Sequence, residues 1–270
     1  MKIASTLQYN GSAFAGFQKQ KNERTVQEEL EKVIYKIFRL HTTIYAAGRT
    51  DSGVHAYGQV VHFSLPDDCL HPNKTLAEYI YGFNALLPND ISIIHAEVVP
   101  KNFHARFSCQ SREYLYQILN SDYRMAFYQQ SYLWVRDRLN TDKMQEAGRL
   151  LLGEHDFAAF TKKVYSNMNE NTIRLLQEVH IINTHPFIFI HFKGSGFLHN
   201  MIRIITGLLL NVGKEKIEPQ EVQRILESRN RIHCGATMPP HALFFLRANY
   251  ENYRTPDNLV HIPARILVAK

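Results

Sequence analysis

Hydrophobic positions follow two different periods along the chain. A period of two, or a short apolar run, is typical of strands and occurs at residues 2–9, 43–47, 59–65, 91–99, 113–120, 178–182, 187–192 and 243–250. Apolar residues spaced three and four apart are typical of amphipathic helices and occur at residues 25–38, 75–86, 142–152, 198–212 and 219–228. Strands and helices therefore alternate, and some strands are close enough in sequence to form hairpins.

Residues at the predicted helix ends support these boundaries. Thr25 with Glu28, and Thr75 with Glu78, have the spacing of a capping box, in which each residue's side chain accepts from the other's backbone N–H. Gly213 follows the apolar segment 198–212, at a position where glycine commonly ends a helix.

The order of the elements predicts the fold class. Each half of the chain contains about four strands and two or three helices, with hairpin-like strand pairs among them. This pattern favours an α+β fold of two lobes with mainly antiparallel sheets over a doubly wound parallel sheet. We expect an N-terminal lobe at residues 1–105, a C-terminal lobe at 106–250 and a tail at 251–270 that contains two prolines.

Composition excludes several classes of protein. The chain has 270 residues, of which 45% are hydrophobic, as expected of a globular protein. The most apolar run is far shorter than the roughly 20 residues that cross a bilayer, and we expect neither a membrane segment nor a signal peptide. The 3 cysteines are far apart and show no metal-ligand spacing, so we expect no disulfide scaffold, no metal site and a cytoplasmic location.

Charge is distributed unevenly along the chain. The net charge of +6 divides into +1 before residue 126 and +5 from there on. Residues 98–112 and 179–214 contain lysines and arginines but no carboxylate. Such segregation is typical of a face that binds a polyanion, and it also arises by chance on a soluble surface. Charge alone leaves both interpretations open.

A glycine-rich loop between two predicted strands contains the first candidate for chemistry. The segment 47–63 reads Ala-Gly-Arg-Thr-Asp-Ser-Gly-Val-His-Ala-Tyr-Gly-Gln-Val-Val-His-Phe and places the carboxylate of Asp51 near the guanidinium of Arg49. It is not a phosphate-binding loop, because no Gly-Lys-Ser/Thr follows. An aspartate in such a loop is a nucleophile or base in an enzyme, or simply a residue that favours a turn.

The predicted helix 198–212 contains the second candidate, Arg203. This helix is apolar on nearly all sides, which indicates that it is largely buried. A buried arginine needs a carboxylate or another acceptor, and its own helix offers no acid. Arg203 therefore meets a partner from elsewhere in the fold, binds a ligand phosphate, or extends its side chain to the surface.

Several motifs occur in an order that closely resembles the TruA family of tRNA pseudouridine synthases. The central one is Gly48-Arg49-Thr50-Asp51-x-Gly53-Val54-His55-Ala56, continuing to Phe63. The others, in chain order, are Tyr9-Asn10-Gly11, Gly16-Phe17-Gln18, Thr25-Val26-Gln27, Asn84-Ala85-Leu86-Leu87-Pro88, Phe103-His104-Ala105-Arg106, Arg112-x-Tyr114-x-Tyr116, Gly153-x-His155-Asp156-Phe157 and Phe197-Leu198-His199-Asn200-Met201-Ile202-Arg203. The resemblance covers about residues 1–250.

This resemblance implies an activity and a set of catalytic residues. Members convert uridine to pseudouridine in RNA without cofactor or metal, on a uridine flipped out of its stack. By motif match, Asp51 is the nucleophile and Arg203 pairs with it. Tyr114 stacks on the uracil and assists proton removal from C5, and Arg49 fills the space that the flipped base leaves. Further candidates for contact with RNA or substrate are His55, Arg106, Arg112 and Leu243.

The resemblance also implies a fold, a substrate and an assembly. The fold is the pseudouridine synthase core, two ferredoxin-like or RRM-like lobes with mainly antiparallel sheets around a central cleft. The substrate is tRNA, at uridines on the 3′ side of the anticodon stem-loop (tRNA positions 38–40), and the assembly is a homodimer. Two places depart from the family pattern: Ser52 replaces the commoner alanine, and the segment 239–243 replaces a Pro-Ala-x-Gly-Leu pattern.

Two other functions compete with this interpretation. A non-catalytic RNA-binding protein on the same scaffold would not need Asp51, Tyr114 and Arg203 together. A metal-dependent nuclease or phosphotransfer enzyme would need clustered carboxylates for Mg²⁺, and no acidic residue lies near Asp51 in sequence.

Overall fold

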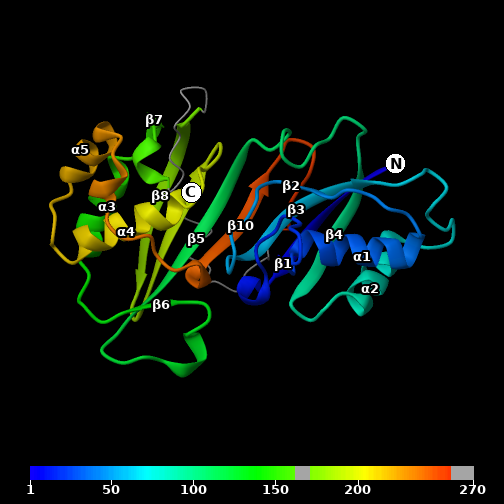
Figure 1. The fold of residues 1–270 in the computed structure, drawn as a ribbon, viewed down its shortest axis with the longest axis horizontal. Coiled ribbons are helices and arrows are strands. Elements are labelled where there is room, and N and C mark those ends of the chain that lie inside the picture. The colour runs from blue at the N-terminus through cyan, green and yellow to red at the C-terminus, as the bar shows by residue number, and fades with distance from the viewer. Residues whose placement is uncertain (162–170, 257–270) are drawn as a thin grey trace. The chain divides into compact units, whose positions relative to one another are not determined.

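The computed structural model describes residues 1–161 and 171–256, which form two compact units (Figure 1). Unit 1 comprises Met1–Arg112 together with the chain from Phe244 onward, and unit 2 comprises Glu113–Leu243. The division differs from the expected boundaries at 105/106 and 250/251. Backbone bonds explain the difference, because Gln110 N–H donates to Asn249 O at 2.9 Å and joins both segments to unit 1.

Unit 1 contains a sheet in which the strand order is β4-β1-β3-β10. The central strand β1 (Lys2–Tyr9) pairs antiparallel with β3 (His55–Ser64) on one side and with β4 (Ile91–Val99) on the other. The last strand, β10 (Leu243–Asn249), pairs parallel with β3 through Phe244 and Phe245. The short strand β2 (Tyr45–Ala46) pairs antiparallel with β3.

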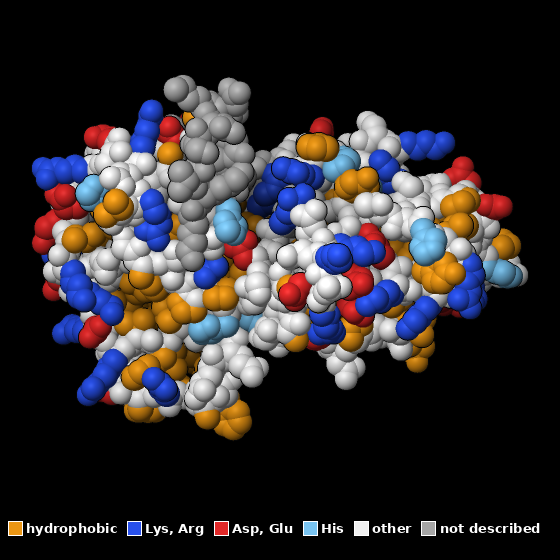
Figure 2. All heavy atoms as spheres, in the orientation of Figure 1, with side chains coloured by type: hydrophobic (Ala, Val, Ile, Leu, Met, Phe, Trp, Pro, Cys, Tyr) orange, Lys and Arg blue, Asp and Glu red, His pale blue; other side chains and the backbone are white. Residues whose placement is uncertain are grey.

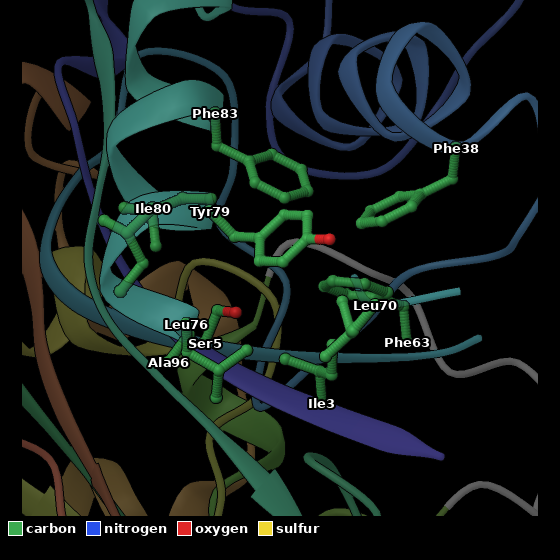
Figure 3. A pocket seen from close by; sticks show the side chains of 11 residues that line it. Ile3, Ser5, Phe38, Phe63, Leu70, Leu76, Tyr79, Ile80, Phe83 and Ala96 are labelled. Carbon is green, nitrogen blue, oxygen red and sulfur yellow. The ribbon is translucent and has the colours of Figure 1, made fainter. Parts of the chain in front are cut away.

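Two helices cover one face of this sheet. Figure 1 shows α1 (Val26–Phe38) and α2 (Leu76–Leu86) on the same side of the strands. The Thr75 capping box forms in both directions, and Thr25 accepts from the backbone N–H of Glu28. Figure 3 shows a narrow apolar crevice in which Phe38 of α1 and Phe83 of α2 face the strands. The apolar stripes read from the sequence therefore form the core of unit 1.

The opposite face of the sheet is covered by irregular chain. The hydroxyls of Thr6 and Tyr253 form a hydrogen bond of 2.6 Å, and the rings of Phe103 and Tyr253 lie 5.9 Å apart. Tyr250 donates to Ala105 O at 2.6 Å. The first residues of the expected tail thus pack on unit 1, while residues 257–270 lie outside the described part of the chain.

Unit 2 contains strands in the order β5-β9-β8-β7. Its strands are β5 (Ser111–Asn120), β6 (Leu133–Val135), β7 (Gly153–Asp156), β8 (Ile173–Thr184) and β9 (Phe187–Gly194). The pairs β7–β8 and β8–β9 are antiparallel, and β6 runs parallel to β5. Most of the pairings in both units are antiparallel, which confirms the predicted α+β class.

Three helices accompany these strands, on the same side of β8 in Figure 1. They are α3 (Thr141–Arg149), α4 (Met201–Gly213) and α5 (Glu221–Ser228). Every residue of α4 is buried except Arg203 and Asn211, as its apolar composition predicts. Single 3-10 turns complete the described chain at Gly11–Ala13, Ala126–Tyr128, Ala158–Phe160, Arg231–Cys234 and Pro240–Ala242.

Candidate functional site

Asp51 opens a tight turn between β2 and β3. The backbone N–H of Val54 donates to Asp51 O at 3.1 Å, which closes the turn over four residues. Gly53 has a φ of 77°, a conformation that favours glycine over residues with a side chain. The strand β3 begins at His55, four residues earlier than the sequence pattern predicts, and the glycine-rich loop is correspondingly short.

The backbone of residues 11–17 holds this turn from outside. Phe17 N–H donates to Thr50 O at 3.1 Å, and Gly53 N–H donates to Phe14 O at 3.3 Å. A Cβ atom on Gly11 would collide with the carbonyl oxygen of Val54. The two segments, which the sequence motifs single out separately, therefore form one structure.

Buried polar side chains hold the same turn from below. The hydroxyls of Tyr9 and Thr50 form a hydrogen bond of 2.8 Å, and Gln59 Nε2 donates to Gly48 O at 2.8 Å. Burial raises the pKa of Tyr9 to about 12, so its hydroxyl keeps its proton at neutral pH. Sequence reasoning assigned no role to Thr50 or Gln59, although a glutamine in an otherwise apolar strand is a usable signal.

Asp51 and Arg49 differ in exposure although they are two residues apart. The side chain of Asp51 is half-buried, whereas Arg49 is exposed. A turn fixed by hydrogen bonds thus presents a half-buried carboxylate with an exposed cation two residues before it. Such a carboxylate can attack an electrophilic carbon or stabilise a positive charge that develops there.

His55 lies beneath the loop. Its Nδ1 accepts from Gly11 N–H at 3.0 Å, and its ring stacks on Phe244 at 4.6 Å. With an exposed fraction of 3%, His55 is placed to position the loop rather than to contact RNA directly.

Arg112 joins the loop to the chain that precedes β5. Its Nε and Nη2 donate to Ala47 O at 3.0 and 2.9 Å, and Nη2 also donates to Arg106 O at 2.6 Å. The side chain of Arg106 is exposed. Of these two expected RNA contacts, Arg112 is engaged with the backbone of unit 1, and Arg106 is open to solvent.

In unit 2, Arg203 is half-buried and bonds to neutral acceptors. Its Nε donates to Met238 O at 2.6 Å, and its Nη1 donates to Asn200 Oδ1 at 2.6 Å. Asn200 has a φ of 61°, and α4 therefore begins at Met201 rather than at the predicted residue 198. Sequence reasoning did not identify Asn200 as a partner of Arg203.

Side chains of unit 2 also hold the segment 235–243, which departs from the family pattern at 239–243. Arg231 Nη1 donates to Gly235 O at 2.7 Å, and Tyr116 donates to Pro239 O at 2.9 Å. A Cβ atom on Gly207 would collide with the carbonyl oxygen of Ala236. The segment ends in a 3-10 turn followed by Leu243, which is buried.

Tyr114 lies on β5 of unit 2. It is 8% exposed, and its ring meets the ring of Phe197 edge to face at 5.1 Å. The expected site residues thus divide between the units. Unit 1 contains Arg49, Asp51, His55, Arg106 and Arg112, whereas unit 2 contains Tyr114, Arg203 and Leu243.

One group of metal-ligating side chains occurs among the described residues. Potential ligand atoms of Glu178, His180 and His191 lie within 4.8 Å of one another. Lys193 Nζ already lies 2.9 Å from Glu178 Oε1, and His191 Nε2 lies 3.1 Å from Glu113 Oε2. The cluster is therefore a network of polar contacts between β5, β8 and β9 that includes the Lys193–Glu178 ion pair. Among the described helices, none has the length and apolar character needed to span a membrane.

Comparison with known proteins yields a consistent set of relatives. A family model described as tRNA pseudouridine synthase matches residues 6–108 and 147–251. A "tRNA pseudouridine synthase A" of Leptospira biflexa is 37% identical over 96% of this chain and 98% of its own length. Proteins of the same name from Bacillus pumilus and Oceanobacillus iheyensis are 38% and 40% identical, each over 93% of this chain and over 100% and 97% of their own lengths.

A chain of a solved Cbf5–Nop10–Gar1 complex is also similar. It aligns with 77% of this chain and 54% of its own, at 12% identity and a TM-score of 0.33, a likeness too slight to support an argument.

Proposed function

The chain belongs to the tRNA pseudouridine synthase family, whose members are isomerases, and from this premise we propose that it converts uridine to pseudouridine in the anticodon stem-loop of tRNA. The observation that carries the proposal is the Asp51 turn, a half-buried carboxylate held in place by backbone bonds, by the close approach of Gly11 to Val54 and by Gly53 at a positive φ. The uridines expected to react lie on the 3′ side of the anticodon arm.

The reaction needs little more than such a carboxylate. The N1–C1′ bond of the uridine breaks, the uracil turns within its pocket, and C5 forms a new bond to C1′. The C5 proton leaves and N1 gains a proton, so the composition of the base does not change. Asp51 acts as the nucleophile in this scheme, and its rigid turn keeps it aligned while the base reorients.

The remaining roles follow from the chemistry that each side chain offers. Arg203 supplies the cation that pairs with Asp51 in this scheme. Tyr114 offers an aromatic face for the uracil and a phenolic oxygen for the C5 proton. Arg49, which is exposed, occupies the space left by the flipped base.

Replacing Asp51 by asparagine tests the proposal most directly. Asp51→Asn keeps the size of the side chain but removes its charge, so we expect pseudouridine formation in a tRNA transcript to fall on the order of 10⁴-fold or more. Binding of the same tRNA should change less than about twofold, because the backbone bonds of the turn remain.

Asp68, an exposed carboxylate of the same unit, provides the matched control. Asp68→Asn should keep full activity. Pseudouridine is measured by mass spectrometry of the RNA, and binding by fluorescence anisotropy. If Asp51→Asn still modifies tRNA, Asp51 is not the nucleophile. Inactivity of the unmutated protein on any tRNA would favour the non-catalytic RNA-binding alternative, and inhibition by a chelator would favour the metal-dependent one.

Arg203 is tested by a pair of substitutions. Arg203→Met removes the charge and both hydrogen bonds, and we expect at least about a hundredfold loss of activity with about 2 kcal/mol of lost stability. Arg203→Lys keeps the charge and should retain part of the activity. Arg224→Met, at an exposed arginine of α5, should change stability by less than about 0.5 kcal/mol. Full activity of Arg203→Met would contradict the proposed role.

Assembly and location complete the proposal. We expect the protein to form a homodimer, which would present two tRNA-binding surfaces, and to act in the cytoplasm, where its substrate is. Analytical ultracentrifugation checks the first point, and a monomer at micromolar concentration would contradict it. Fractionation of cells with an antibody to the chain checks the second.

A further inference from the structure

A row of contacting aromatic side chains lies on the surface of unit 1. The rings of Tyr45 and His62 are stacked, 5.2 Å apart at an angle of 18°, and those of His62 and His104 meet edge-on, 4.6 Å apart at 63°. The row ends in Phe107, whose ring is tilted by 37° and lies 4.4 Å from that of His104. We name these four side chains the Phe107 platform.

The outer members of the platform are exposed. The exposed fraction is 77% for Phe107 and 49% for Tyr45, whereas His62 is 3% exposed. A large aromatic ring of this exposure has no role in the core of unit 1. It is supported from below by imidazoles, so its face is held at a defined position.

Backbone bonds keep the platform rigid. His104 Nδ1 accepts from the N–H groups of Arg106 and Phe107 at 3.1 and 3.3 Å. His62 Nδ1 accepts from Ala105 N–H at 3.1 Å. The turn that presents Phe107 is therefore fixed by two imidazole nitrogens, and little conformational freedom is lost when a ligand stacks on it.

The charges around the platform are those that attract nucleic acid. The guanidinium of Arg106 lies 5.7 Å from the centre of the Phe107 ring, and residues 98–112 contain no carboxylate. On the face drawn in Figure 2, basic side chains are widespread, with acidic, histidine and hydrophobic side chains among them. Burial lowers the pKa of both His62 and His104, so these rings are neutral aromatic surfaces at neutral pH.

The platform is connected to the loop that contains Asp51. Arg112 donates to Arg106 O within the platform turn and to Ala47 O at the start of the loop. Tyr45 in β2 also precedes this loop directly. A base stacked on the platform would thus lie on the same rigid part of unit 1 as the proposed nucleophile.

We propose that Phe107 is a stacking residue for an unpaired base of the tRNA substrate, one that flanks the uridine undergoing reaction, while Arg106 contacts the adjacent phosphate. This inference rests on the proposed function and extends it to a specific binding surface. Stacking on an aromatic face is tolerant of base identity, because every base has such a face. The platform therefore contributes affinity and register without selecting a sequence.

The test is a substitution series at Phe107, with anisotropy of a labelled tRNA transcript as the readout. Phe107→Ala and Phe107→Leu should each weaken binding about tenfold, because both remove the ring, and Phe107→Trp should bind as the unmutated protein does. Tyr81→Ala is the matched control, since Tyr81 of α2 is 79% exposed and has no part in the platform. It should leave binding unchanged.

Salt dependence separates the two parts of the proposal. Phe107→Ala should lower affinity by the same factor at low and high salt, because stacking displaces no counterions. Arg106→Gln should instead reduce the slope of log affinity against log salt by about 1.

The outcomes that overturn the inference are distinct from a failure of the proposed function. Binding within twofold of the unmutated protein for Phe107→Ala, retained binding for Phe107→Leu, an equal loss in Tyr81→Ala, or no tRNA binding by the unmutated protein would each overturn it. If the unmutated protein binds tRNA but forms no pseudouridine, the proposed function fails, and the binding series still decides whether Phe107 stacks on RNA.

Discussion

The loop before β3 in unit 1 and the segment 235–243 in unit 2 are both held in place without regular secondary structure, but by different means. The loop receives backbone bonds from residues 11–17, such as Gly53 N–H to Phe14 O, in addition to side-chain bonds such as Gln59 Nε2 to Gly48 O. The segment is fixed mainly by side chains that donate to its carbonyl groups, among them Arg203 and Tyr116. A backbone hydrogen bond survives most substitutions of the side chain but is lost when the backbone conformation changes. A hydrogen bond from a side chain is lost when that side chain is replaced.

The difference bears on how each unit contributes to the proposed chemistry. In the proposed chemistry Asp51 must keep its position while its own side chain reacts, and backbone bonds to Thr50 and Gly53 hold the turn on both sides of it. Arg203 combines two tasks in the same proposal, since its guanidinium donates to the segment 235–243 and supplies the charge. A mutation at Arg203 therefore changes structure and electrostatics together.

The largest effect is expected at a feature that both regions share, a glycine packed directly against a backbone carbonyl oxygen of another segment. Gly11→Ala places a Cβ against Val54 O, and Gly207→Ala places one against Ala236 O. Since backbone atoms cannot move aside easily, we expect each to lower the free energy of unfolding by about 3 kcal/mol, measured by urea denaturation. Gly82→Ala, where a Cβ meets open space within α2, should be neutral or stabilising.

The two glycine variants should differ in activity. Because the Gly11 contact touches the Asp51 turn, Gly11→Ala should lower activity even at temperatures where the protein stays folded. If both alanine variants were as stable as the unmutated protein, neither glycine would lie as close to the opposing carbonyl oxygen as described.

A second prediction concerns His62, a side chain of unit 1 that accepts a hydrogen bond from the backbone N–H of Ala105. It holds a loop of unit 1 much as the side chains of unit 2 hold the segment 235–243. Burial, then the charges of His104 and Lys2, lower the pKa of His62 from 6.5 to about 4. His62 therefore binds a proton more readily in the unfolded chain than in the folded protein. The free energy of unfolding that this difference contributes is present above about pH 6.5 and is lost as the pH falls toward 4. At pH 5 the loss is about 2 kcal/mol.

His62→Gln keeps an acceptor for Ala105 N–H but does not titrate. Its stability should therefore vary less between pH 8 and pH 5 than that of the unmutated protein, as measured by thermal and urea unfolding. An unchanged pH dependence would mean that His62 is not the group responsible.

The smallest effects come from a matched pair of tyrosines. Tyr116→Phe leaves a backbone carbonyl of Pro239 without its donor, whereas Tyr9→Phe removes a partner of the side chains of Thr50, whose hydroxyl can rotate, and Gln59. We expect losses of about 1.5 and about 0.5 kcal/mol respectively. The reverse order, measured by the same urea titrations, would contradict the contrast between the two regions.

Much of the fold was predictable because it depends on local patterns. The stripe on α1, the capping box at Thr75 and the buried character of α4 all follow from residues within a few positions of one another. The short strands β6 and β7 were not predicted, because three or four residues do not establish a period. The start of α4 was placed too early because a left-handed Asn200 precedes it.

The candidate site was only partly predictable, for a related reason. Asp51 and Arg203 stand out as a carboxylate in a turn and a cation in an apolar helix, and both signals are local. The groups that fix them are remote in sequence. Tyr9 contacts Thr50 across 41 residues, Arg112 contacts Ala47 across 65, and Arg203 contacts Met238 across 35. The hydrophobic periodicity of the sequence does not indicate such pairs, so only the folded chain identifies them.

The parallel pairing of β10 with β3 has a consequence for biosynthesis. When residues 1–112 leave the ribosome, the edge of β3 that later receives Phe244 has no partner, and Tyr253 is not yet available to cover Thr6. Unit 1 therefore cannot reach its final form until nearly the whole chain has been translated, although its first strand is synthesised at the start. Unit 2 is continuous, so it can finish folding first, and a stalled or truncated product would leave the Asp51 loop on an incomplete sheet.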